Sequence, residues 1–255
     1  MKSTFLNHEK PLITAMIQCP TADECIAKIK ASLAEGAEAF GIQLCQLRRE
    51  FRSKEGLKEI FDACEGKPIY VTSYRHTQNE GYTDEECCEL LLQALDAGAT
   101  LLDVMGDTFC IDKKYQLTFD QEAVKKQKAF IDEVHRRGGE VLMSTHTPDS
   151  ISYDECLMIA KAQAERGADV LKIVVYSHST DELPKYISAI QQIKKETNKT
   201  LLFLVTGVGE TLRYVGPNFG VDMYLCVESH GPKDTPAQPL IKRIKAIRDN
   251  IIFEV

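Results

Sequence analysis

Eight short apolar runs rich in β-branched residues alternate along the chain with longer segments of helical periodicity. We expect strands at 11–17, 39–47, 68–74, 100–105, 140–146, 170–176, 201–207 and 223–229. Most of their starts are roughly 25 to 35 residues apart, which suits a strand, a helix and two loops. Such alternation is typical of βα units around a parallel sheet. Because no linker rich in Pro, Gly or Ser divides the chain, the sequence predicts an α/β fold with a single (β/α)8 TIM barrel domain over residues 1–255.

The segments between these strands carry signals that begin and end helices. The segment 21–36 begins with Thr21 as a cap, and the segment 152–167 places Leu157, Ala160 and Ala164 along one face. Glycine follows several of these helices, at Gly36, Gly98, Gly139 and Gly167. Since glycine accepts the left-handed backbone that ends many helices, we expect these four residues to lead back into the next strand.

Composition limits the partners and the compartment. The net charge is -7 and no basic run could neutralise phosphates, which argues against nucleic acid as a partner. The nine cysteines form an odd set without a C-x-x-C pair, which favours reduced thiols over a disulfide framework. The sequence shows no signal peptide and no apolar stretch long enough to span a bilayer. We therefore expect a cytoplasmic protein with no membrane partner.

Lys172 lies in the middle of ADVLKIVVYS, a run that otherwise predicts a fully buried strand. Burial disfavours the charged form of a lysine and lowers its pKa, which makes the amine nucleophilic near neutral pH. The alternative is that Lys172 ends on a rim or pairs with a carboxylate, because unpaired lysines are seldom fully buried. The residues on the other strands decide between these interpretations.

Polar residues gather where the predicted strands end, which is where barrels of this kind build their active sites. They are Gln46, Arg48, Arg75, His76, Glu80, Asp103, Ser144, His146, Arg213, Ser229, His230 and Gln238. A nucleophilic lysine, a histidine on the adjacent strand and several arginines fit Schiff-base chemistry on a keto acid. The lysine would form the imine, the histidine would move the proton of the neighbouring carbon, and an arginine would hold the carboxylate.

These residues lie within motifs. The most specific are G-A-D-V-L-K-I at 167–173 and S-T-H at 144–146. The others are Q-L-R at 46–48, the arginine followed by E-G at 75–81, G-E-T-L-R at 209–213 and P-A-Q at 236–238. With these motifs the chain resembles, across nearly its full length, type I 3-dehydroquinate dehydratase, the Schiff-base hydro-lyase of the shikimate pathway.

The resemblance implies a reaction and a role for each residue. Lys172 would form the imine with the C3 ketone of 3-dehydroquinate, and His146 would take a C2 proton and then protonate the departing C1 hydroxyl, giving 3-dehydroshikimate. Arg213 would hold the substrate carboxylate, and Glu80 would orient His146. The remaining substrate-binding residues would be Gln46, Arg48, Arg75 and Gln238. The resemblance implies no metal and no organic cofactor, because the lysine is the electron sink; it also implies a homodimer.

The chain departs from the family pattern at several of these positions. Gln46 replaces the acid of the usual E-x-R, and an amide can orient a histidine but adds no charge. The spacing from Arg75 to Glu80 is one residue longer than usual. Asp234 stands where a hydroxyl is usual, and a carboxylate near a carboxylate-binding site is unfavourable unless it faces away or meets another group.

Three alternatives stay open. One is a Schiff-base lyase or aldolase of the same barrel that acts on a related hydroxylated keto acid. Another is a metal-dependent barrel enzyme that uses His76, His146 and His178 with Asp103. The last is a binding protein of low activity that keeps the fold, because a fold does not guarantee a function.

Overall fold

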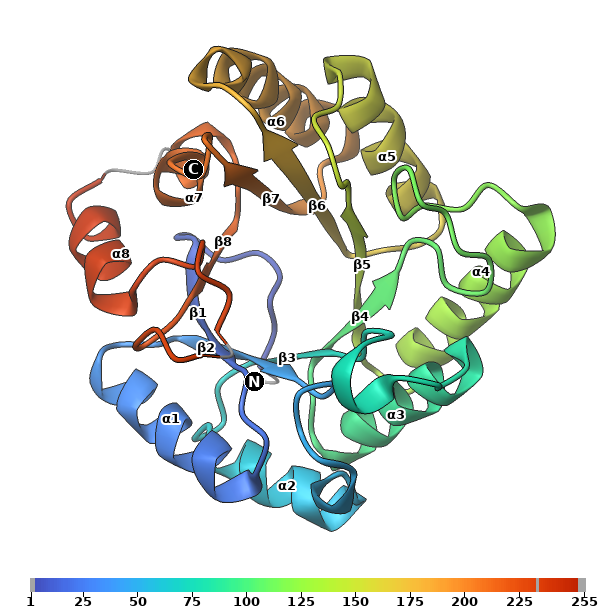
Figure 1. Ribbon diagram of the computed structural model, residues 1–255, viewed down its shortest axis with the longest axis vertical. Helices are drawn as coiled ribbons and strands as arrows, with labels where there is room; N and C mark the ends of the chain where they lie inside the picture. Colours follow the sequence, from blue (N-terminus) through green and yellow to red (C-terminus); the bar gives the residue numbers. More distant parts are fainter. Residues whose placement is uncertain (1–2, 233, 252–255) are drawn as a thin grey trace. The chain divides into compact units, whose positions relative to one another are not determined.

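The computed structural model describes residues 3–232 and 234–251. The strands are β1 (Leu12–Ile17), β2 (Ala39–Gln43), β3 (Ile69–Thr72), β4 (Leu101–Met105), β5 (Glu140–His146), β6 (Val170–Ser177), β7 (Thr200–Gly207) and β8 (Met223–Cys226). The helices are α1 (Ala22–Ala34), α2 (Lys54–Asp62), α3 (Asp84–Ala97), α4 (Gln121–Arg136), α5 (Tyr153–Glu165), α6 (Leu183–Thr197), α7 (Leu212–Val215) and α8 (Ile241–Arg248). Strand and helix thus alternate along the described chain, as the colours of Figure 1 show.

The strands form one parallel sheet in the order β7-β6-β5-β4-β3-β2-β1-β8. Strands β1 to β7 therefore follow chain order in the sheet, and β8 lies beside β1. Eight parallel strands in this order, each followed by a helix, have the topology of a (β/α)8 barrel. The predicted fold class is confirmed.

Three of the expected strands end earlier than predicted, and β3 does so by two residues, at Thr72. β2 ends at Gln43, and the next residues turn, because the amides of Gln46 and Leu47 donate to the carbonyls of Gln43 and Leu44. β8 ends at Cys226, since Val227 then pairs with the segment at Pro239 and Leu240. The run 44–47 is apolar because Leu44, Cys45 and Leu47 are buried in a turn, and not because the chain stays extended.

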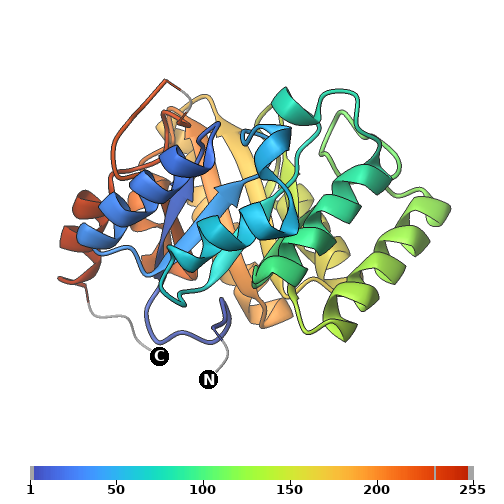
Figure 2. The same cartoon turned by 90° about the horizontal axis from the view of Figure 1, so that it is seen from below.

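The chain divides into two compact units, with boundaries inside β4 and β8. The first unit consists mainly of Leu12–Asp103 and the segment from Leu225 onward. Its strands β1, β2 and β3 pair in register, with Ala15 opposite Phe40 and Phe40 opposite Ile69. Helices α1, α2 and α3 lie side by side in Figure 2. A Cβ on Gly41 of β2 would contact the end of the Met16 side chain, so Met16 would have to move to accommodate it.

The second unit consists mainly of Val104–Tyr224. Its strands β5, β6 and β7 pair over most of their length, and α5 packs on α6. The apolar residues of β6 and β7 are almost all buried, and each buried Val, Leu or Ile side chain stabilises the fold by roughly 1.5–3 kcal/mol. This unit therefore holds Lys172 on one of its best-packed strands.

Hydrogen-bonded caps begin several helices. Thr21 caps α1 as expected, and capping boxes at Thr83 and Ser152 begin α3 and α5. Such a cap contributes about 1 kcal/mol because it satisfies a free helical amide.

Two expectations for the helices were wrong. The buried face of α5 consists of Cys156, Ile159, Ala160 and Gln163, so Ala160 is buried as predicted, whereas Leu157 and Ala164 are only half-buried. Gly36, Gly98 and Gly167 take the expected positive φ, but after α4 the positive φ belongs to Gly138 and not to Gly139. The observed face of α5 is thus shifted by one residue from the predicted one.

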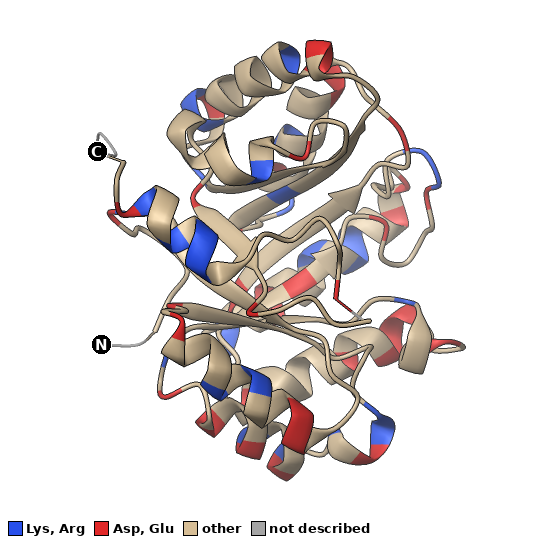
Figure 3. Cartoon of the chain, turned by 60° about the vertical axis from the view of Figure 1, so that its left-hand side comes forward, with Lys and Arg blue, Asp and Glu red and all other residues tan. Residues whose placement is uncertain are grey.

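Eight of the nine cysteine thiols are buried, Cys110 is exposed, and all nine are free. Acidic and basic residues are interspersed along the helices in Figure 3. No helix within residues 3–232 and 234–251 is long and apolar enough to cross a membrane.

Candidate active site

Lys172 lies in the middle of β6, with 4% of its surface exposed. It pairs with Ser144 of β5 on one side and with Leu202 of β7 on the other. Along β6 the burial alternates beyond this point, since Val174 and Tyr176 are half-buried while Val175 and Ser177 are buried. Side chains two apart on a strand share a face. The face that carries Lys172 is therefore closed at Lys172 and becomes accessible toward the carboxyl end of the strand.

His146 is the last residue of β5 and lies on this same face. It pairs with Val174, two residues beyond the pairing of Ser144 with Lys172. Its ring is half-buried, and its Nδ1 lies 3.2 Å from the Oε1 of Gln116, in the loop between β4 and α4. The expected neighbours Lys172 and His146 thus share one face of the β5–β6 pair, with the histidine nearer to solvent.

Arg213, on α7, is 6% exposed. Its Nε donates to the carbonyl of Val205 over 2.7 Å. Burial lowers the pKa of Arg213 to about 10, an effect that the Glu210 carboxylate opposes. That is the guanidinium's one hydrogen bond within the described residues, so its two terminal nitrogens are free to hold a carboxylate.

Gln238 and Asp234 lie in the loop before α8, in the first unit. Gln238 is 6% exposed, and its Oε1 accepts a hydrogen bond of 2.9 Å from Nε2 of Gln18. Asp234 is also buried, and its two carboxylate oxygens lie 2.6 and 2.5 Å from Nζ of Lys28 on α1. The carboxylate that departs from the family pattern is therefore neutralised by a lysine.

Gln46 and Arg48 follow β2 instead of lying on it. Gln46 is half-buried in the turn, and Arg48 is exposed. The Nε of Arg48 lies 3.2 Å from a carboxylate oxygen of Glu50, and its guanidinium lies over the ring of Phe51. In this structure Arg48 is thus engaged with its own short segment.

Arg75 and Glu80 follow β3. Arg75 forms a two-point ion pair with Asp84, the first residue of α3, over 2.5 and 2.8 Å. Glu80 is exposed at the end of a short 3-10 helix, Thr77–Asn79, and its backbone carbonyl accepts from Arg49. The role of Glu80 in orienting His146 stays a proposal.

Asp103, the buried acid of β4, accepts hydrogen bonds from two tyrosine hydroxyls. The donors are Tyr70 and Tyr74, the latter over 2.7 Å. Burial first, and then the Asp103 charge, raise the pKa of both tyrosines well above its usual value. Asp103 is therefore a hydrogen-bonded carboxylate among phenols.

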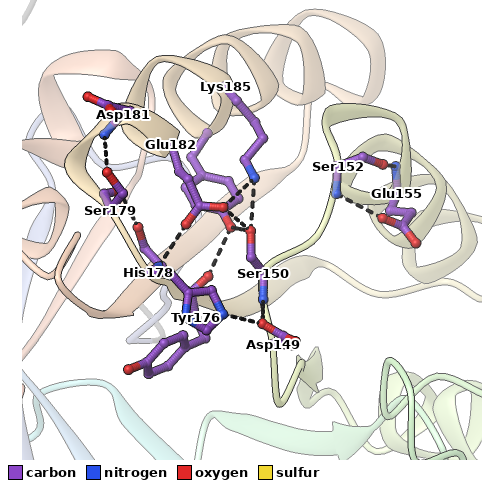
Figure 4. A network of polar contacts seen from close by, with 12 residues as sticks. Asp149, Ser150, Ser152, Glu155, Tyr176, His178, Ser179, Asp181, Glu182 and Lys185 are labelled. Carbon is purple, nitrogen blue, oxygen red and sulfur yellow. Dashed lines mark hydrogen bonds and ion pairs between the residues drawn. The ribbon is translucent and has the colours of Figure 1, made fainter.

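The metal-dependent alternative finds no support in the geometry. Within the described residues no group of three or more His, Cys, Asp and Glu is placed to hold a metal ion. His178 instead lies 2.5 Å from a carboxylate oxygen of Asp149, in a network that joins the loops after β5 and β6 (Figure 4). In the same network Lys185 donates to Ser150 and to Glu182, and the amide of His178 also donates to Glu182.

The sequence alone did not identify three side chains that contact residues singled out for the site. They are Gln116 beside His146, Lys28 beside Asp234 and Asp84 beside Arg75. Each lies in an exposed or helical segment without a motif. Only Asp84 carried a signal, since it begins a capped helix nine residues after Arg75.

Lys172 is a buried lysine on a strand, and His146 ends the neighbouring strand. On this topology, such a pair defines a (β/α)8 barrel enzyme. The model of the type I 3-dehydroquinase family matches residues 13–251. The chain belongs to this family. The resemblance indicated by its motifs is confirmed.

Named relatives agree with this result at low identity. The chain is similar to the 3-dehydroquinate dehydratase of Klebsiella pneumoniae, at 24% identity over 98% of this chain and 96% of that protein. The match to the enzyme of Alkaliphilus oremlandii, at 25% identity, spans 52% of this chain and about half the length of that relative, 51%. The type I 3-dehydroquinate dehydratase structure from Clostridium difficile has a TM-score of 0.78 at 16% identity, covering 95% of this chain and 92% of that one. The last match supports the fold alone.

Proposed function

We propose that the protein dehydrates 3-dehydroquinate to 3-dehydroshikimate through a Schiff base on Lys172. The observation that carries this proposal is the shared face of β5 and β6, which holds a buried amine and, two residues further along, a half-buried imidazole. Desolvation favours the neutral amine, which is the form that attacks a ketone. Family membership supports the choice of substrate.

In the proposed reaction Nζ of Lys172 adds to the C3 carbonyl, and one water leaves as the imine forms. His146 removes a C2 proton, and the electron pair of the C–H bond moves toward the imine nitrogen. The protonated His146 then gives its proton to the C1 hydroxyl, which leaves as water. Hydrolysis of the imine consumes one water and frees Lys172, so the net change is the loss of one water from the substrate.

The remaining assignments are part of the same proposal. The buried Arg213 would hold the substrate carboxylate, supported by its two unused terminal nitrogens. Gln46, Arg48, Arg75 and Gln238 would contact the remaining polar groups of the substrate, and Glu80 would orient His146. No metal or organic cofactor enters these steps.

One observation favours a second candidate, a related hydroxylated keto acid. Two of the arginines assigned to the substrate are paired with carboxylates of their own segments, Arg48 with Glu50 and Arg75 with Asp84. A substrate with fewer or differently placed hydroxyls would not need them. The imine on Lys172 is common to both candidates.

Reductive trapping tests both candidates. Incubation with 3-dehydroquinate and borohydride should leave a mass adduct on Lys172, and without borohydride the conjugated product should appear by ultraviolet absorbance. Lys172→Ala should remove the adduct and the activity, whereas Lys161→Ala, at an exposed lysine of the same unit, should keep both. An adduct without product would point to the related keto acid. Neither adduct nor product, or full activity in Lys172→Ala, would overturn the mechanism.

Three properties of the whole protein belong to the same proposal. We propose that residues 1–255 form one barrel domain, that the protein is a homodimer, and that it works in the cytoplasm on a small carboxylate substrate. Family membership and the (β/α)8 topology support these statements. Sedimentation of the purified chain would test the dimer.

A further inference from the structure

We propose that Gln116 is a positioning residue for His146 and fixes which ring nitrogen acts on the substrate. This inference rests on the proposed role of His146 in proton transfer. The loop between β4 and α4, green in Figure 1, contains Gln116, and β5 ends at His146. There the side-chain oxygen of Gln116 lies 3.2 Å from Nδ1 of His146.

The hydrogen bond selects one tautomer. An amide oxygen can only accept, so Nδ1 of His146 must carry the proton in this arrangement. The other nitrogen, Nε2, then holds the lone pair, which is the group a general base needs. Because Nδ1 donates to Gln116, Nε2 is the nitrogen that takes the proton from the substrate.

The backbone of Gln116 is held in a conformation that few side chains adopt. Its φ is +52°, in the left-handed region that disfavours residues other than glycine. Such a conformation is costly and persists only where the surroundings fix it. A residue held in this way beside a reactive side chain is typical of a functional position.

The surroundings do fix this loop, and they fix it against β5. The amide of Gly106, at the start of the loop, donates to the carbonyl of Ser144 over 2.7 Å, two residues before His146. The buried Arg166 donates to the carbonyls of Gly106 and Thr118, and Gln127 also donates to Gly106. The end of β5 and the start of the loop are therefore held together.

The tip of the loop is held separately. The hydroxyl of Tyr115 donates to Glu155 of α5 over 2.6 Å, and the amide of Tyr115 donates to Asp112 over 2.7 Å. The amide of Gln116 donates to the carbonyl of Asp112. A Cβ on Gly106 would lie 2.8 Å from the carbonyl oxygen of Gln116, so the close approach that places Gln116 needs glycine at that position.

The side chain of Gln116 is neutral, which bears on the pH profile of the reaction. A carboxylate beside the ring would favour the imidazolium and raise the pKa of His146, whereas an amide orients the ring without adding charge. Replacing Gln116 by glutamate therefore adds a charge beside the ring while it keeps the length of the side chain.

The test compares Gln116→Ala and Gln116→Glu with Lys113→Ala, at an exposed residue of the same loop. In Gln116→Ala, kcat should fall about 10- to 100-fold with KM within about twofold, because the ring loses its orientation while the substrate contacts remain. In Gln116→Glu, the acid limb of the pH profile should move up by about one unit, with part of the rate restored at high pH. Lys113→Ala should match the wild type in kcat and in the pH profile.

A double variant separates positioning from a structural role. In the His146→Ala background, Gln116→Ala should cause no further loss of kcat, because the group that it orients is gone. Equal losses in both backgrounds, or an unshifted acid limb in Gln116→Glu, would refute the inference. Reductive trapping on Lys172 should be kept in Gln116→Ala. A wild-type protein that neither traps nor turns over 3-dehydroquinate would instead refute the proposed function.

Discussion

The two units of the molecule hold their polar residues in different ways. In the second unit Lys172 and His146 lie on paired strands, and Arg213 is buried on a helix. In the first unit Gln46, Arg48, Arg75 and Glu80 lie in turns after their strands, and both arginines are paired with nearby carboxylates. In the proposed mechanism, the two groups that meet the reacting atoms are placed by strand register, whereas most of the groups assigned to the rest of the substrate are placed by loops. The groups placed by loops are therefore easier to change without loss of the groups placed by strands.

The contrast between Arg213 and Arg75 should give the largest effect. In Arg213→Ala, kcat/KM should fall about a thousandfold, since a buried charged contact to a carboxylate is worth several kcal/mol. In Arg75→Ala the loss should stay below about tenfold, because the Asp84 carboxylate already neutralises this guanidinium. Steady-state kinetics measure both. Equal losses of kcat/KM in the two variants would contradict the difference between the two units.

The buried pair of Lys28 and Asp234 should give the next effect, on stability. Asp234 has a side chain that is 2% exposed, so Lys28→Met leaves a buried carboxylate without its partner. The free energy of unfolding should fall by about 3 kcal/mol, measured by denaturant unfolding. Lys58→Met, which removes an exposed ion pair with Asp62, is the control and should cost about 0.5 kcal/mol. A loss at Lys28 no larger than at Lys58 would contradict a role for the buried pair.

The smallest effect concerns the loop of the second unit at low pH. Hydrogen bonds from the backbone of Ser152, and then from the hydroxyl of Tyr115, lower the pKa of Glu155 from 4.5 to about 2. Because the folded pKa is depressed, this stabilisation is present above pH 4.5 and disappears as the pH falls toward 2. Glu155→Gln should therefore flatten the pH dependence of the melting temperature in this window. An unchanged slope would show that the carboxylate does not stabilise the loop.

The sequence predicted the fold and the face that carries Lys172 because both follow from local periodicity. An apolar run with one lysine is visible in the letters, and so is the histidine that ends the previous strand. The pairings of Asp234 with Lys28 and of His146 with Gln116 span 206 and 30 positions, and no periodicity relates their members. They depend on how loops are held after the strands have paired. The early end of β2 was missed for a related reason, since a buried turn and a buried strand are equally apolar.

The ion pair between Lys28 of α1 and Asp234, in the loop before α8, also limits which residues related sequences can carry at these two positions. A carboxylate at 234 is tolerated because Lys28 meets it, since the side chain of Asp234 is 2% exposed and that of Lys28 is 15% exposed. An acid at 234 without a lysine at 28 would therefore be costly, whereas a lysine at 28 could stay hydrated without the acid. Related chains with a hydroxyl at the position of Asp234 should accordingly show no preference for lysine at the position of Lys28, and a reconstructed ancestor with the hydroxyl should fold with either residue there.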